Sequence, residues 1–155
     1  METKKTEKES GIEIEYDTLI FKSPASEYTP EHEIGIESIT MDEHYTRIDF
    51  TYISPKKYTN GSWANINPGT YIRPSGSSKK LYMVKAINIP ISPNKHFFQR
   101  CGQVLQFTLL FPALPKSVTE IDIVEKLEGG NYFNFFRVGL TKGQPLLIDI
   151  NNYFN

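Results

Sequence analysis

The residues best suited to nucleophilic or acid–base chemistry are widely separated in this chain. Cys101 is the only cysteine, and of the three histidines only His96 lies near it in the sequence. A cysteine nucleophile needs a neighbouring histidine and an oxyanion site, and no cysteine-protease signature surrounds Cys101. The sequence therefore favours an unreactive thiol, with a cysteine- or histidine-dependent enzyme as the alternative.

The histidines and carboxylates also lack the spacing of a metal site or of a catalytic carboxylate pair. Zinc sites usually contain a close pair of ligands, and His32 has only Glu31 and Glu33 beside it, which on a strand point to the opposite face. Asp122 and Glu125 are three residues apart, so on a strand they too face opposite sides. We therefore expect no metal, cofactor or catalytic residue. We expect Asp122 and Glu125 to be exposed or to bind backbone at a strand end.

Aromatic and amide side chains between residues 52 and 82 are the best candidates for ligand binding. Aromatic rings stack on sugar C–H bonds and on peptide side chains, and asparagines donate and accept hydrogen bonds. Loops on a rigid scaffold commonly carry binding residues. The candidates are Trp63, Tyr58, Tyr71, Asn60, Asn65 and Asn67. The alternative is that Trp63 is buried at the end of the core, which is the favoured interpretation of that residue, and that the asparagines form turns.

Short β-strands must position these residues. Apolar and polar residues alternate with period two, no stretch shows helical spacing over three turns, and prolines fall between the runs. About seven to nine strands separated by turns predict an all-β, antiparallel, immunoglobulin-like β-sandwich, with a small barrel as the competing shape. The expected strands are residues 12–21, 35–41, 44–53, 70–73, 81–87, 103–111, 119–125 and 133–138, with 146–150 as an edge strand.

The chain is expected to form a single domain over residues 12–155, after a disordered tail at residues 1–11 that is rich in charge and lacks apolar anchors. Edge strands would permit a homodimer, but nothing in the sequence specifies an oligomeric state. The predicted core consists of Ile48, Phe50, Tyr52, Leu105, Phe107, Leu109, Phe111, Ile121, Ile123, Phe136 and Val138.

Composition narrows the classes of partner. The 155 residues carry 17 basic and 18 acidic side chains, a formal net charge of −1, which argues against nucleic acid as the main partner. A single cysteine forms no intrachain disulfide. No run approaches the ~18 apolar residues of a transmembrane segment. The first ten residues lack the apolar stretch of a secretory signal, so either the protein is cytoplasmic or its signal segment is absent from this chain.

A series of landmarks runs from Trp63 to Leu140. They are Trp63 and Ile66, Tyr71 and Ile72 with Gly76, Tyr82 with Ile89 and Pro90, then Phe107, Leu109 and Phe111 with Leu114 and Pro115, then Asp122 with Glu125, and Phe136, Val138, Gly139 and Leu140. Their order resembles a β-sandwich domain common in Bacteroidetes proteins, sometimes found ahead of a thioredoxin-like domain in exported proteins. Asn88 stands where a glycine is usual before Ile-Pro. The resemblance implies a protein of the cell envelope, periplasm or exterior, secreted or lipid-anchored, with no catalytic residues to carry over.

The sequence therefore predicts a non-catalytic, extracytoplasmic binding or accessory module that recognises a protein or a glycan through the loops around Trp63. The alternatives are an enzyme that uses Cys101 or a histidine, and a purely structural surface protein.

Overall fold

A computed structural model describes residues 2–9, 12–23, 33–129 and 132–148, and within these ranges all regular structure is β-strand. The all-β prediction is confirmed, but the described residues form twelve strands, more than the seven to nine expected. The strands are β1 (Glu2–Glu9), β2 (Ile12–Lys22), β3 (Ile34–Met41), β4 (Tyr45–Ile53), β5 (Trp63–Ala64), β6 (Tyr71–Pro74), β7 (Leu81–Tyr82), β8 (Lys85–Ile87), β9 (His96–Phe97), β10 (Val104–Pro112), β11 (Glu120–Val124) and β12 (Asn134–Gly139).

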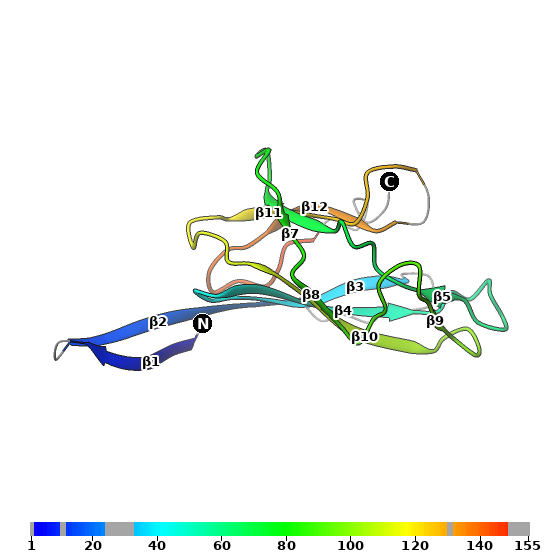
Figure 1. Ribbon diagram of the computed structural model, residues 1–155, viewed down its shortest axis with the longest axis horizontal. Coiled ribbons are helices and arrows are strands. Elements are labelled where there is room, and N and C mark those ends of the chain that lie inside the picture. Colours follow the sequence, from blue (N-terminus) through cyan, green and yellow to red (C-terminus); the bar gives the residue numbers. More distant parts are fainter. Residues whose placement is uncertain (1, 10–11, 24–32, 130–131, 149–155) are drawn as a thin grey trace.

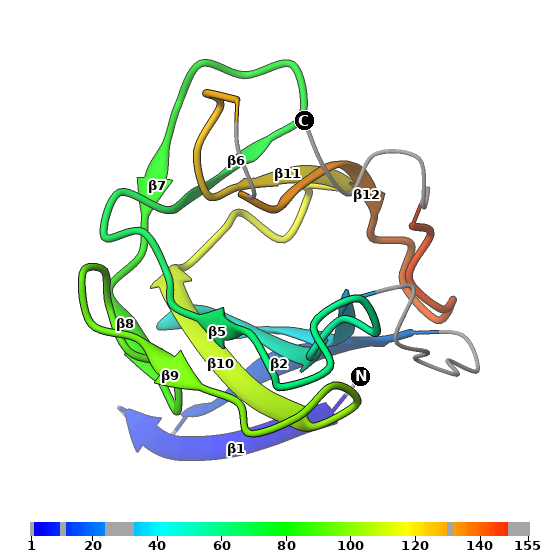
Figure 2. The same ribbon diagram turned by 90° about the vertical axis from the view of Figure 1, so that its right-hand side faces the viewer.

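The strands form two main sheets and one small one. The order is β1-β2-β3-β4-β10-β8 in the six-stranded sheet, β12-β11-β6-β7 in the four-stranded sheet, and β5-β9 in the third. Neighbouring strands are antiparallel throughout. Figures 1 and 2 show the two main sheets as separate layers, and the chain passes between them from β4 to β6, from β7 to β8 and from β10 to β11.

The core lies between these layers because alternation along each strand turns one apolar face inward. Phe50 on β4 lies opposite Phe107 on β10, and their rings stack at 5.0 Å between centroids. Phe135 on β12 reaches Phe50 from the other sheet, at 6.2 Å. Most of the predicted core residues are buried, whereas Tyr52 is only half-buried.

The predicted hairpin at residues 35–53 is confirmed as β3 and β4, but the run 81–87 is not one strand. Leu81 and Tyr82 pair with β6, whereas Lys85 to Ile87 pair with β10 in the other sheet. Between them the Met83 amide donates to the Thr70 carbonyl and the Val84 amide to the Leu110 carbonyl. The chain therefore changes layer at residues 83–84, where hydrogen bonding switches from one sheet to the other.

At the N-terminus the structure has a strand where the sequence predicts a disordered tail. β1 pairs with β2 from Glu2↔Thr18 to Glu9↔Ile12, and only Leu19 to Lys22 of β2 pair with β3. The two strands extend beyond the rest of the six-stranded sheet as an arm (Figure 1). A strand edge offers free backbone donors and acceptors to any extended segment, so polar composition does not prevent pairing.

A β-bulge in β12 overturns the prediction that Phe136 lies in the core. The register passes from Ile121↔Val138 to Ile123↔Phe135, which leaves Phe136 and Arg137 opposite the single residue Asp122. Two residues on the bulged strand then span one on its partner, so inward alternation shifts by one position. Phe135 is buried in place of Phe136, which is half-buried.

The predicted last strand, at 146–150, is described only to residue 148. Its Leu147 forms an isolated antiparallel bridge with Gly139 at the edge of β12.

Candidate functional site

A pocket of about 760 Å³ has lining residues from both layers and from β5. β5 and β9 lie at one end of the molecule (Figure 1). The start of β3, the end of β4 and the middle of β10 line one side, and the residues after β11 and before β12 line the other. The loop before β5 borders the mouth. The lining residues are Glu33, Ile34, Tyr52, Pro55, Lys57, Tyr58, Gly61, Ser62, Trp63, Ala64, Asn65, Ile89, Phe107, Glu125, Gly129, Tyr132 and Phe133.

The loop from residue 54 to residue 62 is fixed by contacts at both ends. The Phe98 amide donates to the Ser62 carbonyl at 2.9 Å, and the hydroxyls of Ser54 and Ser62 are 3.1 Å apart. Gly61 has φ +90°, and a side chain there would collide with the Phe98 carbonyl. This close approach of two backbone segments explains why a glycine is required at that position.

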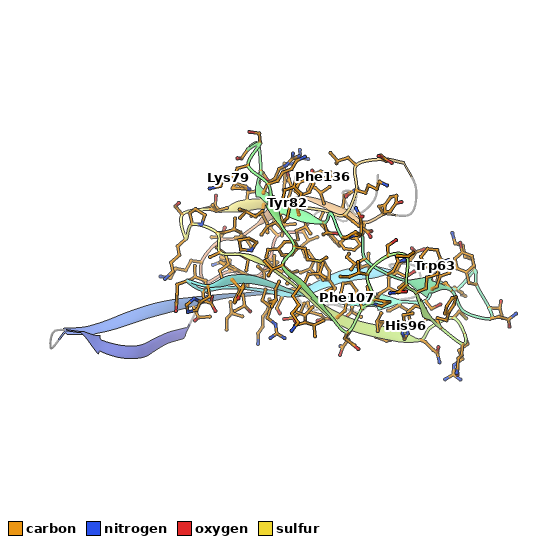
Figure 3. The ribbon with its side chains drawn as sticks, viewed as in Figure 1. Trp63, Lys79, Tyr82, His96, Phe107 and Phe136 are labelled. Atoms are coloured by element: carbon orange, nitrogen blue, oxygen red, sulfur yellow. The ribbon has the colours of Figure 1, made fainter. Side chains whose placement is uncertain are left out.

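Trp63 is not buried at the end of the core, so the favoured sequence interpretation of this residue is wrong. Its side chain is 48% exposed. Trp63 lies on the two-stranded β5–β9 pair, opposite Phe97, and it is the next residue, Ala64, that turns inward. The Lys95 Nζ lies 4.3 Å from the centroid of the Trp63 ring. Figure 3 places Trp63 at the end of the molecule away from the β1–β2 arm.

The structure brings three of the six predicted binding residues to this pocket. Trp63, Tyr58 and Asn65 all line it. Tyr58 is exposed, with Lys57 Nζ 5.2 Å from its ring centroid. Asn65 is half-buried, and its Nδ2 donates to the Asn94 carbonyl at 2.9 Å.

The other three predicted residues have different surroundings. Asn60 is exposed and does not line the pocket. Asn67 donates from its Nδ2 to the Glu125 carbonyl at 2.8 Å, a structural contact. Tyr71 is buried on β6, where its ring lies 5.9 Å from that of Tyr82, and its hydroxyl has no hydrogen-bond partner among the described residues.

Sequence reasoning missed Glu125, which is buried in the pocket wall. Its Oε2 accepts from the Asn67 amide at 3.0 Å and its Oε1 from the Phe133 amide at 3.1 Å. Exposure was therefore the wrong expectation, and backbone contact at the strand end is what the structure shows. Burial outweighs these two hydrogen bonds and raises the pKa of Glu125 to about 7. The local sequence does not predict this burial, because Asn67, which contacts Glu125, is 58 residues away from it in the chain.

Asp122 is also buried, but it belongs to the far face of the four-stranded sheet. Its carboxylate accepts from the Arg137 amide, the Ser75 hydroxyl and the Arg73 guanidinium, at 2.8 to 3.0 Å. Burial raises the pKa of Asp122, but these three donors outweigh burial and hold the pKa below its usual value. Asp122 thus fixes the bulge in β12.

The structure describes Cys101, His96 and His44 among the remaining reactive side chains. Cys101 is half-buried, the ring of His96 packs edge-on against Phe98 at 4.8 Å, and His44 contacts Glu43. His32 lies outside the described residues. Over the described ranges no three His, Cys, Asp or Glu side chains form a metal-binding group.

No helix in the described part of the chain could cross a membrane.

Comparison of the chain with protein-family models, with curated proteins and with solved structures found no match.

Proposed function

We propose that the chain is a non-catalytic binding module that recognises a protein or a glycan at the pocket beside Trp63. The observation that carries this proposal is the half-exposed Trp63 ring at the mouth of a pocket of about 760 Å³. Pockets of ~300–1,000 Å³ are typical of ligand sites, and an exposed tryptophan supplies a large apolar face for stacking. Tyr58 and Asn65 add a second ring and an amide to the same opening.

We further propose that the scaffold is a single domain of immunoglobulin-like type. The order of strands supports this. If β3, β4, β8 and β10 correspond to strands A, B, D and E, the order β3-β4-β10-β8 reads A-B-E-D. The order β12-β11-β6-β7 then reads G-F-C-C′, with β1 and β2 added beyond strand A. Loops gather at the two ends of such a sandwich, and the pocket lies at one end.

The compartment is part of the same proposal. The order of landmarks from Trp63 to Leu140, which resembles that of the exported Bacteroidetes domain, favours the cell envelope or the exterior. A module of this kind would meet glycans and surface proteins there. Measuring the native N-terminus by mass spectrometry on fractionated cells tests this, because a processed N-terminus in the envelope fraction supports it and a cytosolic chain that begins at Met1 contradicts it.

A Trp63→Ala variant tests the binding site. The wild-type protein is screened on a glycan array and against surface proteins of the source cells, and each ligand is then titrated against the variant by calorimetry. We expect at least a tenfold loss of affinity, because a stacked aromatic ring is lost at the mouth. Tyr82→Ala is the matched control, since Tyr82 is also exposed but lies on β7, outside the pocket (Figure 3).

Equal losses in the two variants, or full binding by Trp63→Ala with an unchanged circular dichroism spectrum, would contradict the proposed site.

A further inference from the structure

We propose that the ligand of this pocket carries an organic cation, an ammonium or guanidinium group on an apolar stem. This inference rests on the proposed function, because it requires that the pocket is a binding site. The same chemistry is found in a lysine or arginine side chain of a partner protein and in a free alkylamine.

The aromatic lining supports a cationic ligand. Among the residues that the structure describes, six aromatic side chains line the pocket, namely Tyr52, Tyr58, Trp63, Phe107, Tyr132 and Phe133. The face of an aromatic ring attracts cations, and clusters of rings recognise ammonium groups. Two of these rings already make cation–π contacts with lysines of the protein itself, Trp63 with Lys95 and Tyr58 with Lys57. Both lysines are exposed on flexible stems, so a ligand cation can displace them from the ring faces.

The charges in the lining favour the same ligand. Among the described lining residues Glu33 and Glu125 are the carboxylates and Lys57 is the cation, while Lys95 lies over the Trp63 ring but outside the lining. Each Glu125 oxygen accepts one backbone amide, and an ionised carboxylate offers about four lone-pair sites. Lone pairs therefore remain for a ligand donor. Burial removes water from the Glu125 carboxylate, and its pKa of about 7 reflects the cost of keeping a negative charge there. An incoming cation offsets that cost.

The remaining lining suits the apolar stem. Ile34, Ala64, Ile89 and Pro55 also line the pocket and supply aliphatic surface. Burial of a four- to six-carbon chain against this surface contributes ~0.8 kcal/mol per methylene. Charge and apolar surface together distinguish this ligand from an anion, which the carboxylates would repel.

The test compares matched probes at pH 8 in phosphate buffer, where Glu125 is mostly ionised and no buffer amine competes. Nα-acetyl-lysine methylamide is titrated against Nα,Nε-diacetyl-lysine methylamide, and hexylamine against 1-hexanol. Emission of Trp63, the only tryptophan of the chain, reports binding. We expect each cation to bind at least tenfold more tightly than its neutral partner. Tighter binding of the blocked lysine than of hexylamine indicates a protein partner, and the reverse order indicates a free amine.

Substitution of the carboxylates completes the test. Glu125→Gln is expected to lower the affinity for the cations about tenfold and to leave the neutral probes unchanged. Glu33→Gln provides a second variant in case Glu125→Gln does not fold, and Glu120→Gln is the control, because Glu120 is exposed on β11 and does not line the pocket.

Two outcomes would overturn the inference. Equal affinity for cationic and neutral probes would exclude cation recognition while leaving the pocket a binding site. No response to any probe would also exclude it, and the wider proposal would then depend on whether Trp63→Ala loses its glycan or protein ligand.

Discussion

Asp122 in the middle of β11 and Glu125 just after its end show how two carboxylates close in sequence acquire opposite properties. Both are almost fully buried, and burial raises the pKa of each. Asp122 has three donors, one of which is the Arg73 guanidinium at 3.0 Å, whereas the described residues give Glu125 two backbone amides and no cationic partner. The number and charge of the donors therefore decide that the pKa falls at Asp122 and rises at Glu125.

The contacts of Asp122 predict that its replacement weakens the fold. In Asp122→Asn the ion pair with Arg73 is lost and an amide donor faces another donor, so the free energy of unfolding should fall by about 1.5–3 kcal/mol. Urea unfolding followed by circular dichroism measures this change. Glu120→Gln, an exposed substitution on the same strand, should stay within ~0.5 kcal/mol of wild type. A loss at Asp122→Asn no larger than in this control would show that the buried pair contributes nothing measurable.

At the scale of the element, the loop before β5 depends on the approach of its backbone to the segment after β9. Gly61 makes that approach, because its Cα faces the Phe98 carbonyl. Gly76, in the turn between β6 and β7, has a similar left-handed φ of +82° but open space around it. A side chain at Gly76 would therefore meet only the cost of a left-handed backbone conformation, whereas a side chain at Gly61 would also meet a steric clash.

We predict that Gly61→Ala is much more damaging than Gly76→Ala. The left-handed conformation alone costs ~1–2 kcal/mol for a residue with a Cβ, and this is the expected loss at Gly76. Gly61→Ala adds a clash with backbone, which only a displacement of the loop can relieve. Thermal unfolding should show a clearly lower Tm for Gly61→Ala, with altered Trp63 emission in the folded state. Equal Tm values for the two variants would show that the loop adapts without strain.

At the scale of the whole molecule, the raised pKa of Glu125 makes stability depend on pH. The folded state keeps the proton up to a pKa of about 7, whereas the unfolded chain releases it near 4.5. Between these values the folded state binds more protons, so the contribution of this group is full below pH 4.5 and is lost as pH rises through 7. Asp122 acts with the opposite sign, and only below its ordinary pKa of 3.8.

We predict that the wild type loses stability relative to Glu125→Gln as pH rises from 4.5 to 7. The unfolding free energy of the wild type minus that of the variant should therefore fall over this interval. The total change is at most about 3 kcal/mol, at 1.36 kcal/mol for each unit between the two pKa values. Urea unfolding at several pH values across this interval, and at pH 8, measures it. The difference should be flat above pH 8, and a difference independent of pH throughout would contradict the raised pKa.

Strand positions and most core faces of this protein were predictable from sequence because they depend on local alternation. The β3–β4 hairpin and the strand β10 follow directly from side chains that alternate with period two. Phe136 was predicted wrongly because a bulge depends on what lies across the sheet, here Asp122 and its contact with the Arg137 amide. The division of residues 81–87 has the same cause, since the two halves pair with strands of different sheets.

The candidate site was predictable only in part. Residue type and spacing were sufficient to predict an antiparallel β-scaffold with aromatic and amide residues before β6. The exposure of Trp63, the different position of Tyr71 and the burial of Glu125 in the wall of the same pocket depend on the packing of the folded chain. Asn67 and Glu125 are 58 residues apart, yet they are in direct contact. The burial of a residue, the pKa of its side chain and the shape of a pocket depend on such contacts between residues far apart in the sequence, which a local sequence pattern does not predict.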